Sequence, residues 1–142
     1  MGENKQMIPQ VTEKGTRTVL IVEDSENSAA TMEMAVLGIP GVSVLLAPSG
    51  MEALRIINEA GSSVHAIITD LNMPRMDGFE LIRRVRENDR TSAVPIIVVS
   101  ADTDPDTPER VAQMKVEAFF PKPFSPAQVR RKLEQLLNAT TS

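Results

Sequence analysis

Five residues with reactive or ligand-type side chains end or directly follow short apolar runs of the sequence: Glu23, Asp24, Asp70, Ser100 and Lys122. A carboxylate after a strand is often no more than a turn former, so each residue alone predicts little. As a set they offer carboxylates, a hydroxyl and an amine. If the fold brings them together, they can bind a cation and stabilise a phosphoryl group during transfer.

Three carboxylates in one place would repel one another and raise the pKa of one or more of them, and a divalent cation removes this cost. Mg²⁺ prefers oxygen ligands and typically joins one or two carboxylates to a phosphate. The broken stretch after Asp70 lets the main-chain oxygen of Asn72 turn towards such an ion. Lys122 and Ser100 add a second cation and a hydroxyl donor. An aspartate can itself be the nucleophile and form an aspartyl phosphate.

The elements that must position these side chains are predicted by five short apolar runs separated by helical patterns. The runs are rich in Val and Ile and mostly do not alternate, which is typical of strands buried on both faces of a parallel sheet. They are TVLIV (18–22), VSVLLA (42–47), VHAIIT (64–69), VPIIVVS (94–100) and AFF (118–120). Strand and helix repeated five times predict a doubly wound α/β fold with the strand order 2-1-3-4-5.

Helix boundaries are marked by capping residues and by proline and glycine. Three pairs have the capping-box spacing: Ser49 with Glu52, Asp77 with Glu80, and Ser125 with Gln128. Pro108 and Pro126 are predicted at first helical positions. Gly38 and Gly61 suit helix ends. These signals predict helices between the strands and after the last one.

In a fold of this kind, ligands bind at the carboxyl ends of the strands, where the strand order reverses. For the predicted order this point lies between the first and third strands. The first strand leads into Glu23-Asp24, and the third leads into Asp70. Ser100 ends the fourth strand, and the fifth runs into Lys122. The fold therefore predicts that these residues meet at one edge of the sheet.

The bulk composition excludes several other classes of protein. At 142 residues one domain is expected, with residues 1–16 as a flexible tail and 17–142 as the domain. A net charge of −4, with neither Tyr nor Trp, argues against a nucleic-acid partner. The arginines Arg83, Arg84, Arg86 and Arg90 are expected on solvated helix faces, paired with nearby glutamates.

Disulfides and thiolate metal sites are excluded because the sequence has no cysteine. No apolar run approaches the roughly 20 residues that span a bilayer, so no membrane partner is expected. The polar N-terminal residues have no signal-peptide pattern. A cytoplasmic location is expected.

The sequence resembles the receiver domains of response regulators in two-component signalling. The matching stretches are Glu23-Asp24, TDLNMPRMDG (69–78), VVSA (98–101) and FFPKPF (119–124), and the resemblance extends from Thr18 to Asn138. Each stretch alone is a weak signal, but together and in this order they are specific. The resemblance implies a flavodoxin-like (βα)5 fold and a stand-alone receiver similar to chemotaxis regulators, with Mg²⁺ as cofactor.

Carried over residue by residue, the resemblance implies that Asp70 accepts a phosphoryl group from a sensor histidine kinase or a phosphotransfer protein. Mg²⁺ would be bound by Asp24, Asp70 and the main-chain oxygen of Asn72. Glu23 would lie nearby and contact the metal through a water molecule. The protein would be a signalling phosphoacceptor that promotes only its own phosphorylation and dephosphorylation, and so not an enzyme acting on other substrates.

The resemblance also implies roles for residues around the acceptor. Ser100 and Lys122 would bind the phosphoryl oxygens, and the Lys122–Pro123 peptide would be cis. Ser100 and Phe119 would form the switch. Asn72 and Asp102 would set the lifetime of the phosphate. An unknown downstream protein would read the surface of the fourth helix, fifth strand and fifth helix, and the protein would be a monomer or a phosphorylation-dependent dimer.

Three residues depart from the family pattern without touching the reactive set. His65 replaces the acidic residue common five positions before the acceptor. It is expected as an ordinary residue at the start of a strand, near the surface. Lys115 stands where the fourth helix usually ends in glycine, and so is expected to take a left-handed conformation. Pro121 interrupts the fifth strand, which is tolerable if that strand lies at the sheet edge.

Three other interpretations stay open. A phosphohydrolase with an aspartate nucleophile would have a second acid where this sequence has Asn72. A flavin-binding domain would need a loop rich in hydrogen-bond donors after the first strand, and EDSENS (23–28) is acidic there. The third interpretation is a receiver excised from a larger multidomain regulator.

Overall fold

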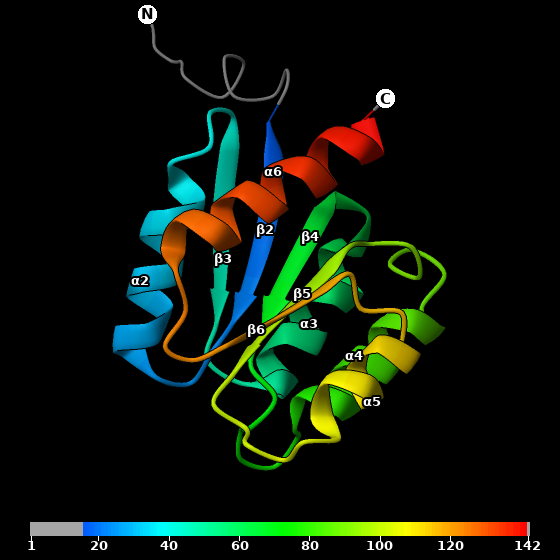
Figure 1. Cartoon of the computed structure of the whole chain (residues 1–142). Coiled ribbons are helices and arrows are strands. Elements are labelled where there is room, and N and C mark those ends of the chain that lie inside the picture. The colour runs from blue at the N-terminus through cyan, green and yellow to red at the C-terminus, as the bar shows by residue number, and fades with distance from the viewer. Residues whose placement is uncertain (1–15, 142) are drawn as a thin grey trace, which may run out of the picture.

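The computed structural model describes residues 16–141, which form a five-stranded parallel sheet with helices on both faces (Figure 1). The elements are β2 (Arg17–Val22), α2 (Glu26–Leu37), β3 (Val42–Ala47), α3 (Gly50–Ala60), the 3₁₀ helix η1 (Gly61–Ser63), β4 (Val64–Thr69), α4 (Gly78–Glu87), β5 (Ile96–Ser100), α5 (Thr107–Gln113), β6 (Ala118–Pro121) and α6 (Pro126–Thr141). The order β3-β2-β4-β5-β6 confirms the predicted 2-1-3-4-5 order. Most of the predicted tail lies outside the described residues.

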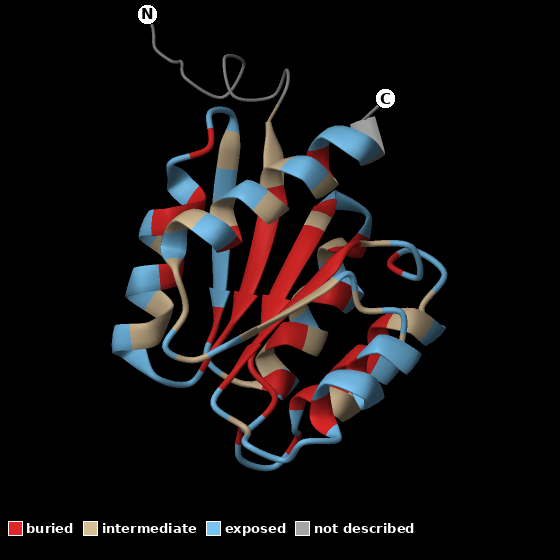
Figure 2. Ribbon diagram, in the orientation of Figure 1, coloured by how far each residue is buried: buried red, intermediate tan, exposed pale blue. Residues whose placement is uncertain are grey.

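The central strands are buried on both faces, as their unalternating apolar sequences predict (Figure 2). In β2, Leu20 and Val22 belong to a core cluster with residues of α3, α4 and α5, whereas Val19 and Ile21 belong to a second cluster with residues of α2 and α6. Successive residues of a strand point to opposite faces. The sheet therefore separates two cores, with three helices on one face and two on the other.

The capping residues predicted from the sequence do begin their helices. Ser49 Oγ accepts from the Glu52 N–H at 3.1 Å, Asp77 Oδ1 accepts from the Glu80 N–H at 2.9 Å, and Ser125 Oγ accepts from the Gln128 N–H at 3.2 Å. α5 begins one residue earlier than predicted, at Thr107 itself. β5 begins two residues later than predicted, because the Val94 N–H is engaged in a turn with Thr91 O at 3.1 Å.

The three departures from the family pattern are accommodated locally. Lys115 has a left-handed φ of 64°, and Pro121 ends β6, which is an edge strand. His65 lies at the start of β4, where the register with β2 shifts, and its Nδ1 accepts from the Thr18 N–H at 3.1 Å. Within residues 16–141, no helix is long and apolar enough to cross a membrane.

Candidate functional site

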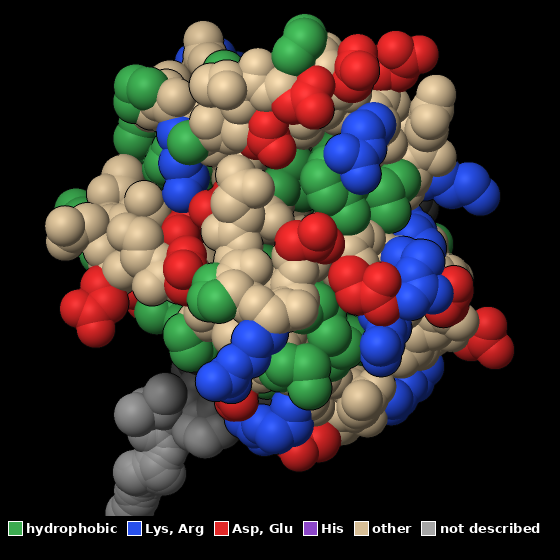
Figure 3. Space-filling model, turned by 90° about the horizontal axis from the view of Figure 1, so that it is seen from below, with side chains coloured by type: hydrophobic (Ala, Val, Ile, Leu, Met, Phe, Trp, Pro, Cys, Tyr) green, Lys and Arg blue, Asp and Glu red, His purple; other side chains and the backbone are tan. Residues whose placement is uncertain are grey.

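The carboxyl ends of the strands bring three carboxylates together beside a lysine. Glu23 and Asp24 follow β2, Asp70 follows β4, and carboxylate oxygens of these three residues all lie within 4.8 Å of one another. Glu23 and Asp70 are buried, with 4% and 6% of their surface exposed, whereas Asp24 is exposed. Figure 3 looks onto this end of the sheet. The cluster is therefore anchored in the protein and open to solvent on one side.

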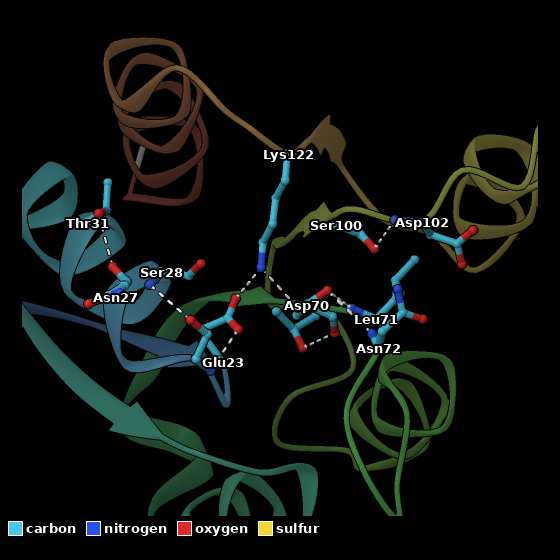
Figure 4. Close-up of polar contacts among 12 residues, drawn as sticks. Glu23, Asn27, Ser28, Thr31, Asp70, Leu71, Asn72, Ser100, Asp102 and Lys122 are labelled. Carbon is cyan, nitrogen blue, oxygen red and sulfur yellow. Dashed lines mark hydrogen bonds and ion pairs between the residues drawn. The ribbon is translucent and has the colours of Figure 1, made fainter.

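Lys122 joins two of these carboxylates (Figure 4). Its Nζ donates to Glu23 Oε1 at 2.7 Å and to Asp70 Oδ2 at 3.1 Å. Burial lowers the pKa of the ammonium, but hydrogen bonds to Glu23 and Asp70 outweigh it and hold the pKa above its usual value. Lys122 therefore keeps its charge at neutral pH.

Glu23 is fixed by hydrogen bonds to both of its carboxylate oxygens. Oε1 accepts from Lys122, and Oε2 accepts from the Ser25 N–H at 3.0 Å. Burial nevertheless raises the pKa of the Glu23 carboxyl, and the charge of Asp70 adds to that effect. The cluster contains three carboxylates and one lysine, so it has an excess of negative charge. Such an all-oxygen set suits a hard cation such as Mg²⁺ better than a soft metal.

Asp70 is held by its own backbone and by the loop that follows it. Its N–H donates to Val22 O at 3.1 Å, which extends the β2–β4 ladder by one residue. Its Oδ1 accepts from the Leu71 N–H at 2.6 Å and from the Asn72 N–H at 3.3 Å. The two oxygens therefore differ: Oδ1 is bound by main-chain amides, and Oδ2 faces Lys122.

Gly78 is a site residue that the sequence interpretation missed. A Cβ atom at this position would lie 2.3 Å from Asp70 O and 2.7 Å from Leu71 Cα, and the Gly78 N–H donates to Leu71 O at 2.8 Å. Helix α4 thus begins directly against the main chain of Asp70 and Leu71. The Asp77-Gly78 pair indicated a helix start, but a sequence gives no sign of what packs against it.

Ser100 ends β5 and Lys122 directly follows the neighbouring strand β6, and the Lys122 N–H donates to Ser100 O at 2.9 Å. Ser100 is fully buried, and its Oγ accepts from the Asp102 N–H at 3.1 Å (Figure 4). The Asp102 carboxylate accepts from the Asp104 N–H at 2.8 Å within its own loop. The Ser100 hydroxyl is therefore tied to the loop that leads into α5.

Phe119 lies in β6, paired in register with Val98 of β5. It is half-buried and packs against the core cluster of α3, α4 and α5. Its neighbour Phe120 is also half-buried, but packs against the cluster on the other face. The predicted cis peptide between Lys122 and Pro123 is present.

A polar hollow of about 450 Å³ lies beside this site, between α2 and the segment after β6. It is lined by Asn27, Ser28, Thr31, Lys122, Pro123 and Phe124. Lys122 therefore contributes to both the hollow and the carboxylate cluster.

Comparisons with known proteins agree with this geometry. The model of the response regulator receiver domain family matches residues 19–134. The chain is 31% identical over 121 residues to chemotaxis protein CheY1 of Helicobacter pylori, covering 84% of this chain and 95% of that protein. It is 32% identical to the CheY homolog of Campylobacter jejuni, covering 84% and 91%.

Solved structures support the same assignment. Chemotaxis response regulator CheY4 of Vibrio cholerae superposes with a TM-score of 0.75 at 28% identity, covering 85% of this chain and 98% of that one. A response regulator receiver protein from Pseudomonas putida gives a TM-score of 0.76 at 28% identity, covering 84% and 97%. The fold, the clustered acidic residues and these matches together show that the chain belongs to the response regulator receiver domain family, whose members have a phosphoacceptor role in signalling.

Proposed function

We propose that Asp70 accepts a phosphoryl group from a sensor histidine kinase or phosphotransfer protein, and that phosphorylation switches a surface that a downstream protein reads. The proposal rests mainly on one observation. Asp70 is a buried carboxylate, bound by two main-chain amides and by Lys122, within 4.8 Å of two further carboxylates.

The transfer is a displacement at phosphorus. Asp70 Oδ2 is the attacking oxygen, because Oδ1 is occupied by the amides of Leu71 and Asn72. The new O–P bond forms as the P–N bond of the donor phosphohistidine breaks, and the imidazole nitrogen keeps the bonding electrons and takes up a proton. Lys122 and Ser100 bind the oxygens of the transferred group, which spreads its charge over donors that are already in position.

Mg²⁺ is the proposed cofactor. Asp24, Asp70 and the main-chain oxygen of Asn72 would hold it, and Glu23 would act through water. The excess of carboxylates over lysine supports a cation here. When bound, the ion supplies positive charge that offsets the carboxylates and stabilises the phosphoryl oxygens. Asp24, the exposed carboxylate, is the most accessible of the three.

The switch begins at Ser100. To bind a phosphoryl oxygen its hydroxyl would swing towards Asp70, and the bond from the Asp102 N–H would draw the β5–α5 loop with it. Space beside β6 would then be vacated, and Phe119 would fill it. Signalling by such a route needs an element with two discrete arrangements. The half-buried Phe119 ring, with room to become more covered, suits that requirement.

The phosphorylated state would be transient, with a lifetime set by Asn72 and Asp102, which flank the acceptor and the hydroxyl residue. The domain would cover residues 17–142 and act in the cytoplasm. It would promote only its own phosphorylation and dephosphorylation. The reading surface would comprise α5, β6 and α6, on a monomer or a phosphorylation-dependent dimer, with no role for nucleic acid or membrane.

The test is phosphorylation by acetyl phosphate with Mg²⁺, followed by intact mass and by lability to hydroxylamine. Asp70→Asn should abolish the hydroxylamine-labile phosphate. Asp106→Asn is the matched control, since Asp106 is an exposed aspartate of the β5–α5 loop. It should label like the parent protein. Undiminished labelling of Asp70→Asn would contradict the assignment of Asp70 as the phosphoacceptor.

A further inference from the structure

The two edges of the sheet are protected very differently. The β6 edge is a four-residue strand that ends in Pro121 and lies between Glu117 and Lys122. Proline, charge and short length all blunt an edge against pairing with another strand. The β3 edge has six residues, Val42–Ala47, with no charge and no proline among them. The β3 edge therefore lacks the features that oppose pairing at the β6 edge.

Half of the main-chain groups of β3 face outwards. Gly41 O and Ala47 O accept from the Arg17 and Glu23 N–H groups at 2.8 and 3.0 Å, so these odd-numbered positions face β2. Because the main-chain groups of successive residues alternate in direction along a strand, Val42, Val44 and Leu46 direct theirs away from the sheet. Among the described strands β3 pairs with β2 alone. The outward groups can therefore receive a further strand.

Apolar side chains gather around the same edge. The exposed large hydrophobic residues of the described chain all lie on β3 or on the helices before and after it: Met34 and Leu37 on α2, Leu45 and Leu46 on β3, and Met51 on α3. Leu45 and Leu46 are 39% and 45% exposed. In Figure 2, β3 is largely coloured as exposed, whereas β2 and β4 beside it are buried.

The sequence around β3 carries no charge at all. From Met34 to Met51 there is no Asp, Glu, Lys or Arg, and the stretch is bounded by Glu33 and Glu52. An unlike protein partner is usually selected through complementary charge. A strand without charge instead meets its own copy without repulsion in any register, and successive side chains such as Leu45 and Leu46 present apolar surface on both faces.

We propose that the β3 edge is a self-association surface, on which the β3 strand of a second copy pairs antiparallel about a two-fold axis. The two sheets join into one, and the outward main-chain groups of Val42, Val44 and Leu46 are satisfied. The register that satisfies all three is centred on Val44, and the interface is isologous, so Leu46 of each copy lies opposite Val42 of the other and Leu45 lies opposite Ser43. One short strand and a few side chains form a small contact, so the dimer is weak.

This dimer is independent of phosphorylation. β3 and β6 lie at opposite ends of the strand order, so the β3 edge is a different edge of the sheet from the one in the α5–β6–α6 surface. The inference does not rest on the role of Asp70. Association should be equal with and without Mg²⁺ and acetyl phosphate, which separates its failure from that of the proposed function.

The experiment is analytical ultracentrifugation of the full chain from roughly 10 μM to 1 mM, a range that covers weak association. A monomer–dimer equilibrium is expected. Leu46→Lys and Leu45→Lys each replace an apolar cross-strand contact with a charge on the edge strand and should weaken dimerisation by roughly tenfold or more. Ala93→Lys is the control for added charge, since Ala93 is exposed in the loop before β5, and it should dimerise like the parent protein.

Amide hydrogen exchange locates the contact. The amides of Val44 and Leu46 should become protected as concentration rises, and this gain should disappear in Leu46→Lys. A monomer throughout the range would overturn the proposal, as would a dimer that both leucine variants leave intact. Protection of these amides that does not change with concentration would also overturn it, because another part of the same chain would then cover the edge.

Discussion

At the residue scale, the position of Asp70 depends on the absence of a side chain at Gly78. Asp70 is anchored by its own hydrogen bonds, but Gly78 permits the first turn of α4 to lie directly against the Asp70–Leu71 main chain. Neither Asp70 O nor Leu71 Cα can yield as a flexible side chain can. Any larger residue at position 78 must therefore move the acceptor, the helix or both.

Gly78→Ala should destabilise the protein by about 1–3 kcal/mol, as overpacking usually does, and should also slow phosphorylation of Asp70. Gly50→Ala is the matched control, because the three atoms nearest to its Cβ would all belong to the flexible Met76 side chain, the nearest at 3.1 Å. Gly50 and Gly78 are each the first residue of a helix, so the two substitutions change helix propensity in the same way. The measurements are urea unfolding and the rate of labelling by acetyl phosphate at a temperature where both are folded. Labelling of Gly78→Ala at the parental rate would show that the acceptor keeps its place.

At the element scale, β6 presents two adjacent phenylalanines to opposite cores. Phe119 packs with the α3, α4 and α5 cluster, and Phe120 with the α2 and α6 cluster. Arg86 of α4 also joins the segment after α5 to the segment before β5, because it donates to Lys115 O at 2.6 Å and to Val94 O at 2.7 Å. Movement of α5 is thus restricted at its carboxyl end, so the β5–α5 loop and the first turn are the parts freest to respond.

Phe119→Ala should leave labelling of Asp70 intact while reducing the response of α5. Full burial of this ring would favour the phosphorylated form by up to roughly 1.5–3 kcal/mol, and less here because the ring is already partly covered. Phe120→Ala removes the same ring from the other face and serves as the control. NMR shifts of α5 and β6 amides on adding beryllofluoride, a phosphoryl mimic, provide the measurement. An undiminished response in Phe119→Ala would mean that the coupling runs by another route.

Sequence periodicity predicted the elements well, because strands buried on both faces and capped helices leave local signatures. It also predicted which side chains meet, since the carboxyl ends of parallel strands share one edge of the sheet. Contacts between distant segments leave no such signature. Arg83 and Arg84 do pair with Glu80, as expected, but Arg86 turns inwards, with 13% of its side chain exposed, to bind main-chain oxygens. The approach of Gly78 to Asp70 was hidden for the same reason.

At the scale of the whole molecule, the strand order places the candidate site and the two edge strands at different positions in one sheet. The site lies where β2 and β4 adjoin, at the reversal of the strand order, while β3 and β6 form the two edges. The candidate site is therefore central, and the two surfaces proposed to bind other molecules include opposite edges of the sheet. A switch at β6 and self-association at β3 can operate without competing for the same residues.

The carboxylate cluster should make the stability of the whole molecule depend on Mg²⁺. Like charges held within 4.8 Å of one another oppose folding, and one lysine offsets only part of that repulsion. Asp24→Asn should therefore make the metal-free protein more stable, by roughly 1 kcal/mol, the scale of a one-unit pKa shift. A ligand that binds only the folded state at ten times its Kd adds about 1.4 kcal/mol, so Mg²⁺ should stabilise the parent protein by that amount.

Asp24→Asn should lose most of this gain from Mg²⁺, whereas Glu23→Gln should keep more of it, because a residue that acts through water contributes less to binding than a direct ligand. Asp89→Asn, at an exposed position after α4, controls for the change in net charge. Urea unfolding with and without Mg²⁺ at constant ionic strength measures both effects. Equal losses in Asp24→Asn and Glu23→Gln would contradict the division of roles between the two residues. A metal-free Asp24→Asn less stable than the parent would show that Asp24 contributes contacts worth more than the repulsion it adds.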